Sequence, residues 1–95
     1  MSSTWATLAR HTNFVVETLL RGPALSWRRV PDPPEYAEAF EASAPTFKIL
    51  ATRWSKDGCE GYAAIATVLR PRLVVINLPV SIAEQVFDKA ASSLN

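Results

Sequence analysis

The chain has few of the residues on which catalysis and metal binding usually depend. Its 95 residues include one cysteine, one histidine and three glycines. One cysteine excludes an internal disulfide, and one cysteine with one histidine falls short of the four ligands that a structural zinc site usually takes. A Gly-x-Gly-x-x-Gly loop that cradles phosphate is also missing. The sequence therefore predicts that the protein binds no metal and no cofactor.

An excess of charge of one sign is missing too. Ten basic and nine acidic residues give a net charge of +1, whereas domains that bind nucleic acid usually carry a clear basic excess. The longest nearly continuous apolar run, residues 73–80, is interrupted by Asn77 and Pro79, and about 20 apolar residues are needed to span a bilayer. The N-terminal residues lack the basic and apolar regions of a signal peptide. We therefore expect a cytoplasmic protein that does not contact membranes.

The overall composition is that of a globular protein. Hydrophobic residues make up 48% of the chain and charged residues 20%, which is ordinary for a folded domain. A chain of this length supports one compact core. We therefore predict a single domain over residues 1–95.

Residues 4–21 carry the clearest helical pattern. Apolar side chains recur at spacings of about three and four residues along one stripe, at Trp5, Leu8, Val15 and Leu19. The pair Gly22 and Pro23 predicts the end of this helix, because glycine adopts the left-handed conformation easily and proline cannot continue a helix. A final helix is expected after residue 80, with Ser81 as its cap and Glu84 completing a capping box.

Residues 32–43 are typical of a second helix. Asp32 is suited to cap it, two prolines fit its first turn, and Glu35 stands where a capping box places a glutamate. Tyr36 and Phe40 would then share one face of the helix, which we interpret as a core stripe.

The rest of the chain predicts strands. Residues 46–54 and 59–69 favour strand residues and are separated by residues 55–58, a turn in which glycine supplies a positive φ. Residues 73–78 predict a third strand, apolar on both faces and therefore covered on both or centrally placed. Residues 25–30 form either a short edge strand or an ordered loop, and the strand is favoured.

The predicted fold class is α+β, in the order α-α-β-β-β-α, with a three-stranded antiparallel meander packed against two or three helices. The sheet has four strands if residues 25–30 join it.

The order of a helix, an antiparallel meander and a final helix resembles that of double-stranded-RNA-binding domains. Pro34-Glu35-Tyr36 and Pro45-Thr46-Phe47 are also similar to short proline-aromatic motifs of that family. Ser81-Ile82-Ala83-Glu84, however, lacks the lysine cluster with which those domains hold phosphates, and residues 73–78 add a strand. We take the resemblance as an analogy of element order, and its departures imply that RNA binding has been lost.

His11 and Cys59 are the candidate catalytic side chains. His11 lies mid-helix beside Arg10, a position typical of a surface or boundary histidine rather than of a general base. Cys59 follows Gly58 at a predicted hairpin tip, and nothing in the sequence brings a histidine or a helix N-terminus there to activate the thiol. We predict no enzymatic activity, and a small Cys59-dependent enzyme remains the least favoured alternative.

Tryptophan is frequent for the length, with three in the chain. Trp27 stands beside Arg28 and Arg29 in a proline-flanked segment, and Trp54 follows Arg53 at the end of a predicted strand. Tryptophan and arginine are enriched at binding hot spots, so we predict that these five residues bind a partner. The competing interpretation is that both tryptophans cap the ends of the core while the arginines remain in water.

These observations favour a non-catalytic protein-binding module that docks sterically on another protein. It would act as an adaptor, an accessory subunit or an inhibitor, the last in keeping with a phage or mobile-element origin, and as a monomer or a homodimer. A surface with charges of both signs suits a protein partner. The alternative from another class is an RNA- or DNA-binding domain in which a tryptophan stacks on a base and arginines contact phosphates, namely Arg28, Arg29, Arg53, Arg70 and Arg72.

Overall fold

The structure, a computed structural model, describes residues 4–35 and 37–94, with side chains from residue 7 onward. Over these residues the elements are α1 (Thr4–Arg21), β1 (Arg28–Arg29), β2 (Ala37–Ser43), β3 (Phe47–Lys56), β4 (Cys59–Val68), β5 (Val74–Asn77) and α2 (Val80–Ser93). Each strand is antiparallel to the next, and the spatial order β1-β2-β3-β4-β5 repeats the chain order. The described chain is therefore an α+β fold in which, along the sequence, one helix precedes an antiparallel meander and one helix follows it.

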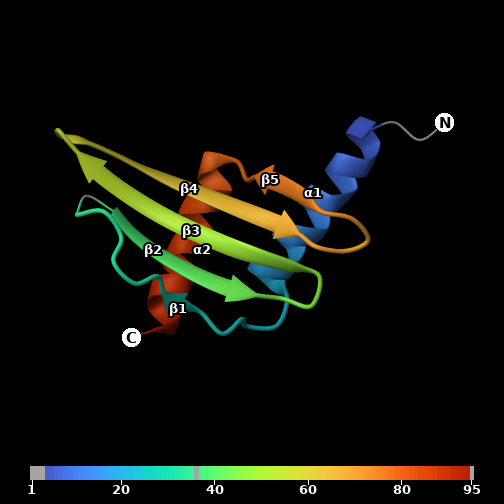
Figure 1. Ribbon diagram of the computed structural model, residues 1–95, viewed down its shortest axis with the longest axis horizontal. Coiled ribbons are helices and arrows are strands. Elements are labelled where there is room, and N and C mark those ends of the chain that lie inside the picture. Colours follow the sequence, from blue (N-terminus) through green and yellow to red (C-terminus); the bar gives the residue numbers. More distant parts are fainter. Residues whose placement is uncertain (1–3, 36, 95) are drawn as a thin grey trace.

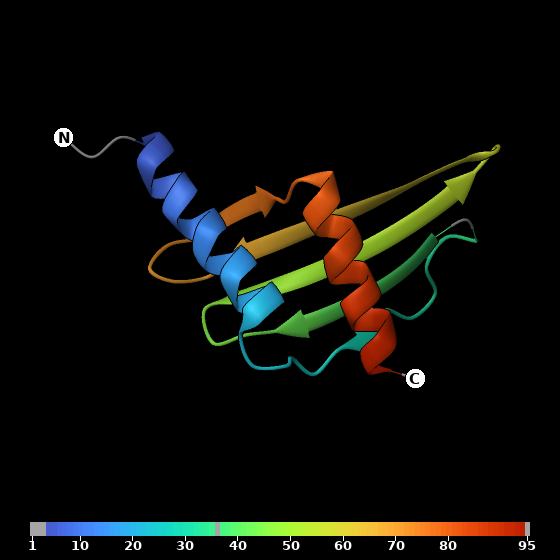
Figure 2. The same ribbon diagram turned by 180° about the vertical axis from the view of Figure 1, so that it is seen from behind.

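Both helices lie on the same face of the sheet. Figure 1 shows the sheet in front of α1 and α2, and Figure 2, the view from the other side, shows the two helices in front of the sheet. The hydrophobic core fills the space between these two layers. The largest fully buried side chains come from both, namely Phe40, Phe47 and Ile49 of the sheet and Val15 and Val86 of the helices.

The first helix confirms the sequence prediction. Val15 and Leu19 are buried and Leu8 is half-buried on its inner side, while the side chain of Trp5 lies outside the described residues. The helix ends at Arg21, and the N–H of Gly22 donates to the carbonyls of Glu17 and Thr18. The expected left-handed conformation of Gly22 is wrong, because Gly58 is the glycine with a positive φ among the described residues.

The prediction of a second helix over residues 32–43 is wrong, because this segment contains strand β2. Asp32 has a φ of 51°, whereas a helix N-cap residue adopts an extended backbone. β2 pairs with β3 over its whole length, from Ala37 with Trp54 to Ser43 with Lys48. This pairing overrides the helical propensity of an alanine- and glutamate-rich segment. The predicted face of Tyr36 lies outside the described residues.

The central hairpin was predicted correctly. β3 and β4 contain ten residues each and pair along their full length. Asp57 and Gly58 connect them with φ values of 54° and 79°. Two consecutive residues with positive φ match the type I′ turn, whose twist suits a two-residue hairpin loop.

Two short strands form the edges of the sheet. The favoured strand within residues 25–30 is present as Arg28–Arg29, paired with β2. The predicted third strand, over residues 73–78, is the opposite edge, and Val75 within it is 60% exposed. The expectation that this strand is central or covered on both faces is therefore wrong, because among the described residues β5 pairs with β4 alone and the face that carries Val75 is uncovered.

The two helices are tied together at the end of α1. Lys89 of α2 donates hydrogen bonds to the carbonyl oxygens of Leu19 at 3.1 Å and Leu20 at 2.9 Å. A cation placed on the last carbonyls of a helix opposes the negative end of its dipole. The predicted cap of α2 at Ser81 is wrong: the helix begins at Val80, and Pro79 occupies the cap position without a side-chain hydrogen bond. Neither described helix is long and apolar enough to cross a membrane.

Candidate functional site

The five residues predicted to bind a partner do not share one surface. Trp27 is only 9% exposed and belongs to the hydrophobic core. This burial agrees with the competing interpretation of the sequence, in which Trp27 caps one end of the core. The other four residues lie on strands, where successive side chains point to opposite faces of the sheet.

Arg29 and Arg53 lie on the face that carries the helices. The guanidinium carbon of Arg29 stands 5.2 Å from the ring centroid of Phe40, and that of Arg53 stands 5.4 Å from the ring centroid of Phe87. These distances are in the range of cation–π contacts, which stabilise modestly at exposed sites. Both arginines therefore cover the edges of the aromatic core on the helix side.

Arg28 and Trp54 lie on the opposite face. Arg28 pairs in register with Glu41 of β2 and forms an ion pair with it, while the neighbouring Arg29 pairs with Glu38 at 3.6 Å on the helix side. Exposed ion pairs of this kind contribute little to stability. The alternation of side chains along the strand, and not these pairs, fixes which side of the sheet each arginine occupies.

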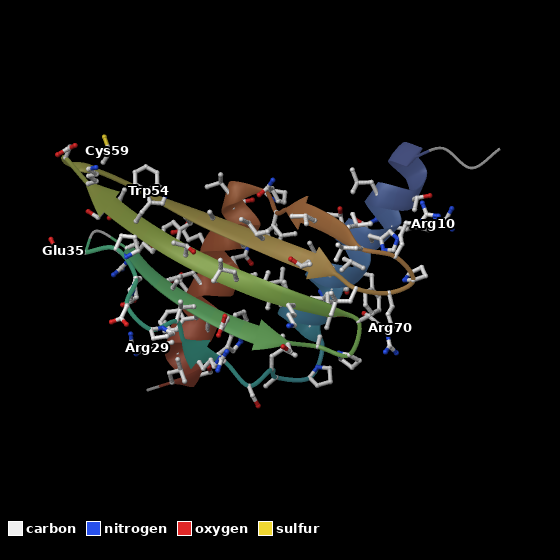
Figure 3. All side chains as sticks on the ribbon, viewed as in Figure 1. Arg10, Arg29, Glu35, Trp54, Cys59 and Arg70 are labelled. Atoms are coloured by element: carbon white, nitrogen blue, oxygen red, sulfur yellow. The ribbon has the colours of Figure 1, made fainter. Side chains whose placement is uncertain are left out.

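We call the side of the sheet away from the helices the open face. Figure 1 views it directly, and Figure 3 shows Trp54 lying on it near one end of β3. Strand alternation and the observed register assign its members. They are Arg28 of β1, Ala37, Ala39, Glu41 and Ser43 of β2, Lys48, Leu50, Thr52, Trp54 and Lys56 of β3, Cys59, Gly61, Ala63, Ile65 and Thr67 of β4, and Val75 and Asn77 of β5.

The open face carries large apolar side chains. Leu50 is 37% exposed, Trp54 38% and Val75 60%, and half-buried Ile65 stands directly across from Leu50 in the register of β3 and β4. An antiparallel sheet with one solvated face usually carries polar residues there. These side chains instead make an apolar band across three strands.

A hollow of about 400 Å³ adjoins this band at the β1 edge, and we call it the Lys48 hollow. Leu50 and Ile65 supply its apolar wall, and Lys48 and the Arg28–Glu41 ion pair supply its charges. Lys48 forms no ion pair with any described residue. The remaining lining comes from Ser26, Ala42, Ser43, Ile49 and Thr67.

Sequence reasoning missed Leu50, Ile65 and Val75. The signal was present in β3. Phe47, Ile49 and Ala51 occupy every second position, and the positions between them would be polar if one face were solvated, but one of those positions holds Leu50. An apolar residue in both sets indicates a strand that has two apolar faces.

The two candidate catalytic side chains are far apart. Cys59 is exposed at the tip of the central hairpin, and Figure 3 shows it at the opposite end of the molecule from Arg10, the neighbour of His11. His11 is half-buried on α1 and lines a second hollow, to whose walls the described part of the chain contributes no acidic residue. Among the described residues, no group of histidine, cysteine, aspartate and glutamate side chains could hold a metal ion.

The open face combines exposed leucine, valine and tryptophan with basic groups at its margins. Comparison of the chain with protein-family models, with curated proteins and with solved structures finds no match.

Proposed function

We propose that this protein is a non-catalytic binding module that docks a partner protein on the open face of its sheet. The observation that carries the proposal is the one-sided placement of the helices. They cover one face, while Leu50, Trp54, Ile65 and Val75 leave apolar side chains on the other. Extended apolar patches on a soluble protein usually mark an interaction site.

The dimensions of the open face suit a standard interface. Each ten-residue strand of the hairpin is about 33 Å long. Strands lie about 4.8 Å apart, so strands of two, seven, ten, ten and four residues present a footprint of roughly 500 Å². A stable protein–protein interface uses about 800 Å² of accessible surface on each partner, so a partner that covers this face and its margins has enough area.

The edges of the sheet are less suitable than its face. β1 contains two residues and β5 contains four. Adding a strand from a partner relies on a long row of unpaired backbone groups, which edges this short do not offer. The partner is therefore expected to lie across the face.

Charge on the open face indicates the chemistry of the partner. Arg28, Lys48 and Lys56 are basic, and Glu41 is the acidic residue among them and is already paired with Arg28. A partner fits best if it places an apolar side chain in the Lys48 hollow and a carboxylate beside the Lys48 ammonium. A second copy of this chain would bring the same basic excess against itself, which disfavours self-association.

Leu50 and Trp54 give the face two anchor points along one strand. They stand four residues apart on β3, which is about 13 Å. A buried tryptophan contact is the commonest kind of binding hot spot. The partner is thus an acidic protein whose contacting segment reaches from the Lys48 hollow to the indole of Trp54.

Nucleic acid is a weaker fit to the same surface. The arginines that were expected to follow a phosphate backbone are divided between the two faces, with Arg28 on the open face and Arg29 and Arg53 on the helix side. A single strand needs a continuous basic groove.

The test places a photo-crosslinking amino acid at Leu50 and, as the control, at Val80, which is 67% exposed on α2. We expect one acidic protein of the native cell to be linked from position 50 and not from position 80. That protein, once purified, should bind the wild type and Val80→Lys equally but bind Leu50→Lys and Lys48→Glu at least about tenfold more weakly, a loss of about 1.4 kcal/mol.

Three outcomes contradict the proposal. Crosslinking only to a second copy of the chain makes the face a homodimer interface. Crosslinking to RNA or DNA, with affinity that falls steeply as salt rises, makes it a nucleic-acid surface. Equal binding by Leu50→Lys, after circular dichroism has shown that this variant is folded, places the interface elsewhere.

A further inference from the structure

A second hollow lies outside the open face, where α1 meets the ends of β3 and β4. Its volume is about 350 Å³, which is in the range of pockets that hold small ligands. We call it the Arg10–Arg70 hollow, and Figure 3 shows these two arginines at the same end of the molecule, one from α1 and one from the turn after β4. The other lining residues are Thr7, His11, Phe14, Thr46, Phe47, Val68 and Pro71.

The floor of the Arg10–Arg70 hollow is apolar. Phe47 is fully buried beneath it, and Val68 is nearly so. Phe14 of α1 stands edge-on to Phe47, with ring centroids 6.3 Å apart and an interplanar angle of 86°, yet it is 56% exposed. A ligand that covers an aromatic side chain this exposed removes apolar surface from water, which stabilises the complex.

The rim of the hollow is basic. Arg10 and Arg70 bring two guanidinium groups to it, and His11 adds an imidazole N–H donor. No acidic residue lines the hollow, and neither arginine forms an ion pair within residues 4–35 and 37–94. Like charges that face one hollow without a counter-charge favour an anion in it.

We propose that the Arg10–Arg70 hollow binds a small organic acid, with its carboxylate between the two guanidinium groups and its hydrocarbon body against Phe14, Phe47 and Val68. The planar fork of arginine matches the two oxygens of a carboxylate. The apolar walls favour a monoanion with an aryl or branched alkyl body over a strongly hydrated phosphate. This site is independent of the partner proposed for the open face.

The test uses three probes that separate charge from apolar body. An amide NMR titration of the purified chain is carried out with 3-phenylpropionate, with the neutral 3-phenylpropionamide, and with propionate, which lacks the ring. We expect saturable shifts at His11, Phe14, Val68 and Arg70 with 3-phenylpropionate, and affinities at least about tenfold weaker for the other two probes.

Variants assign the binding to named side chains. Arg10→Gln combined with Arg70→Gln should weaken 3-phenylpropionate at least about tenfold, whereas Arg72→Gln, an exposed arginine outside the hollow, should leave it within about twofold. Phe14→Ala changes an exposed position and tests the apolar wall separately. It should weaken 3-phenylpropionate and leave the thermal midpoint Tm nearly unchanged.

Each contrary result overturns the proposal. Equal affinity for the acid and the amide removes the role of the arginines. A probe concentration of about 10 mM half-saturates a site whose Kd is about 10 mM, so even a weak site would show shifts. If no saturable shifts are seen at that concentration, the hollow does not bind the acid. Shifts centred on Leu50 and Trp54 would place the ligand on the open face.

Discussion

The indole ring of Trp54 lies directly over the backbone of Gly61, its cross-strand partner on β4. The two residues are paired in the register of the central hairpin. A Cβ atom added to Gly61 would come within 2.6 Å of Cε2 and 2.9 Å of Nε1 of the indole, closer than such atoms can approach. The absence of a side chain at Gly61 therefore leaves the space that the indole of Trp54 occupies.

This contact predicts a coupling between positions 54 and 61. Gly61→Ala should destabilise the wild type by about 1 kcal/mol, because the added methyl group displaces the indole. In a Trp54→Ala background the same change should be neutral or slightly stabilising, because alanine is a better strand residue than glycine. Urea unfolding of the four proteins measures the coupling, and strictly additive effects would show that the ring does not rest on Gly61.

Trp27 is predicted to matter for stability rather than for direct contact with a partner. Because it is buried in the core, Trp27→Ala should lower the free energy of unfolding by about 3 kcal/mol or more through loss of burial and the cavity left behind. Trp54→Ala, at a 38% exposed position, should cost clearly less. The same urea measurement compares them. A Trp27→Ala protein as stable as the wild type would mean that this side chain is not part of the core.

Lys89 is predicted to hold α1 against α2. Lys89→Met keeps most of the aliphatic stem but removes the ammonium that caps the Leu19 and Leu20 carbonyls, and the expected cost is about 1–2 kcal/mol. The matched control is Lys48→Met on the open face, which should change stability by less than about 0.5 kcal/mol. If the two methionine variants unfold at the same urea concentration, the contact between Lys89 and α1 contributes nothing.

The sequence predicted those elements whose signals are local. The turn at Asp57 and Gly58 requires positive φ values that glycine and aspartate tolerate, and so the hairpin could be placed from the residues alone. The end of α1 at Gly22 was equally local. Residues 32–43 could not be placed in this way, because pairing with β3 decides their conformation against their own helical propensity.

The candidate site was harder to predict for a related reason. Trp27, Arg28 and Arg29 are consecutive in the sequence and were expected to act together. In the folded chain Trp27 is buried, and strand alternation sends Arg28 and Arg29 to opposite faces. The open face is assembled from five strands, so its members become neighbours only once the register is known. The local signals were Leu50, which breaks the alternation of its strand, and residues 73–78, which are apolar on both faces.

The most direct test of the account is a methyl cross-saturation measurement on the complex with the purified partner. Saturation of partner protons is transferred to the methyl groups that contact the partner. We predict the strongest attenuation at Leu50, Ile65 and Val75 of the open face, and little at Val80 or Leu94, which are exposed but belong to the helix layer. Attenuation centred on Val80 and Leu94, with Leu50 and Ile65 unaffected, would contradict the docking of a partner on the open face.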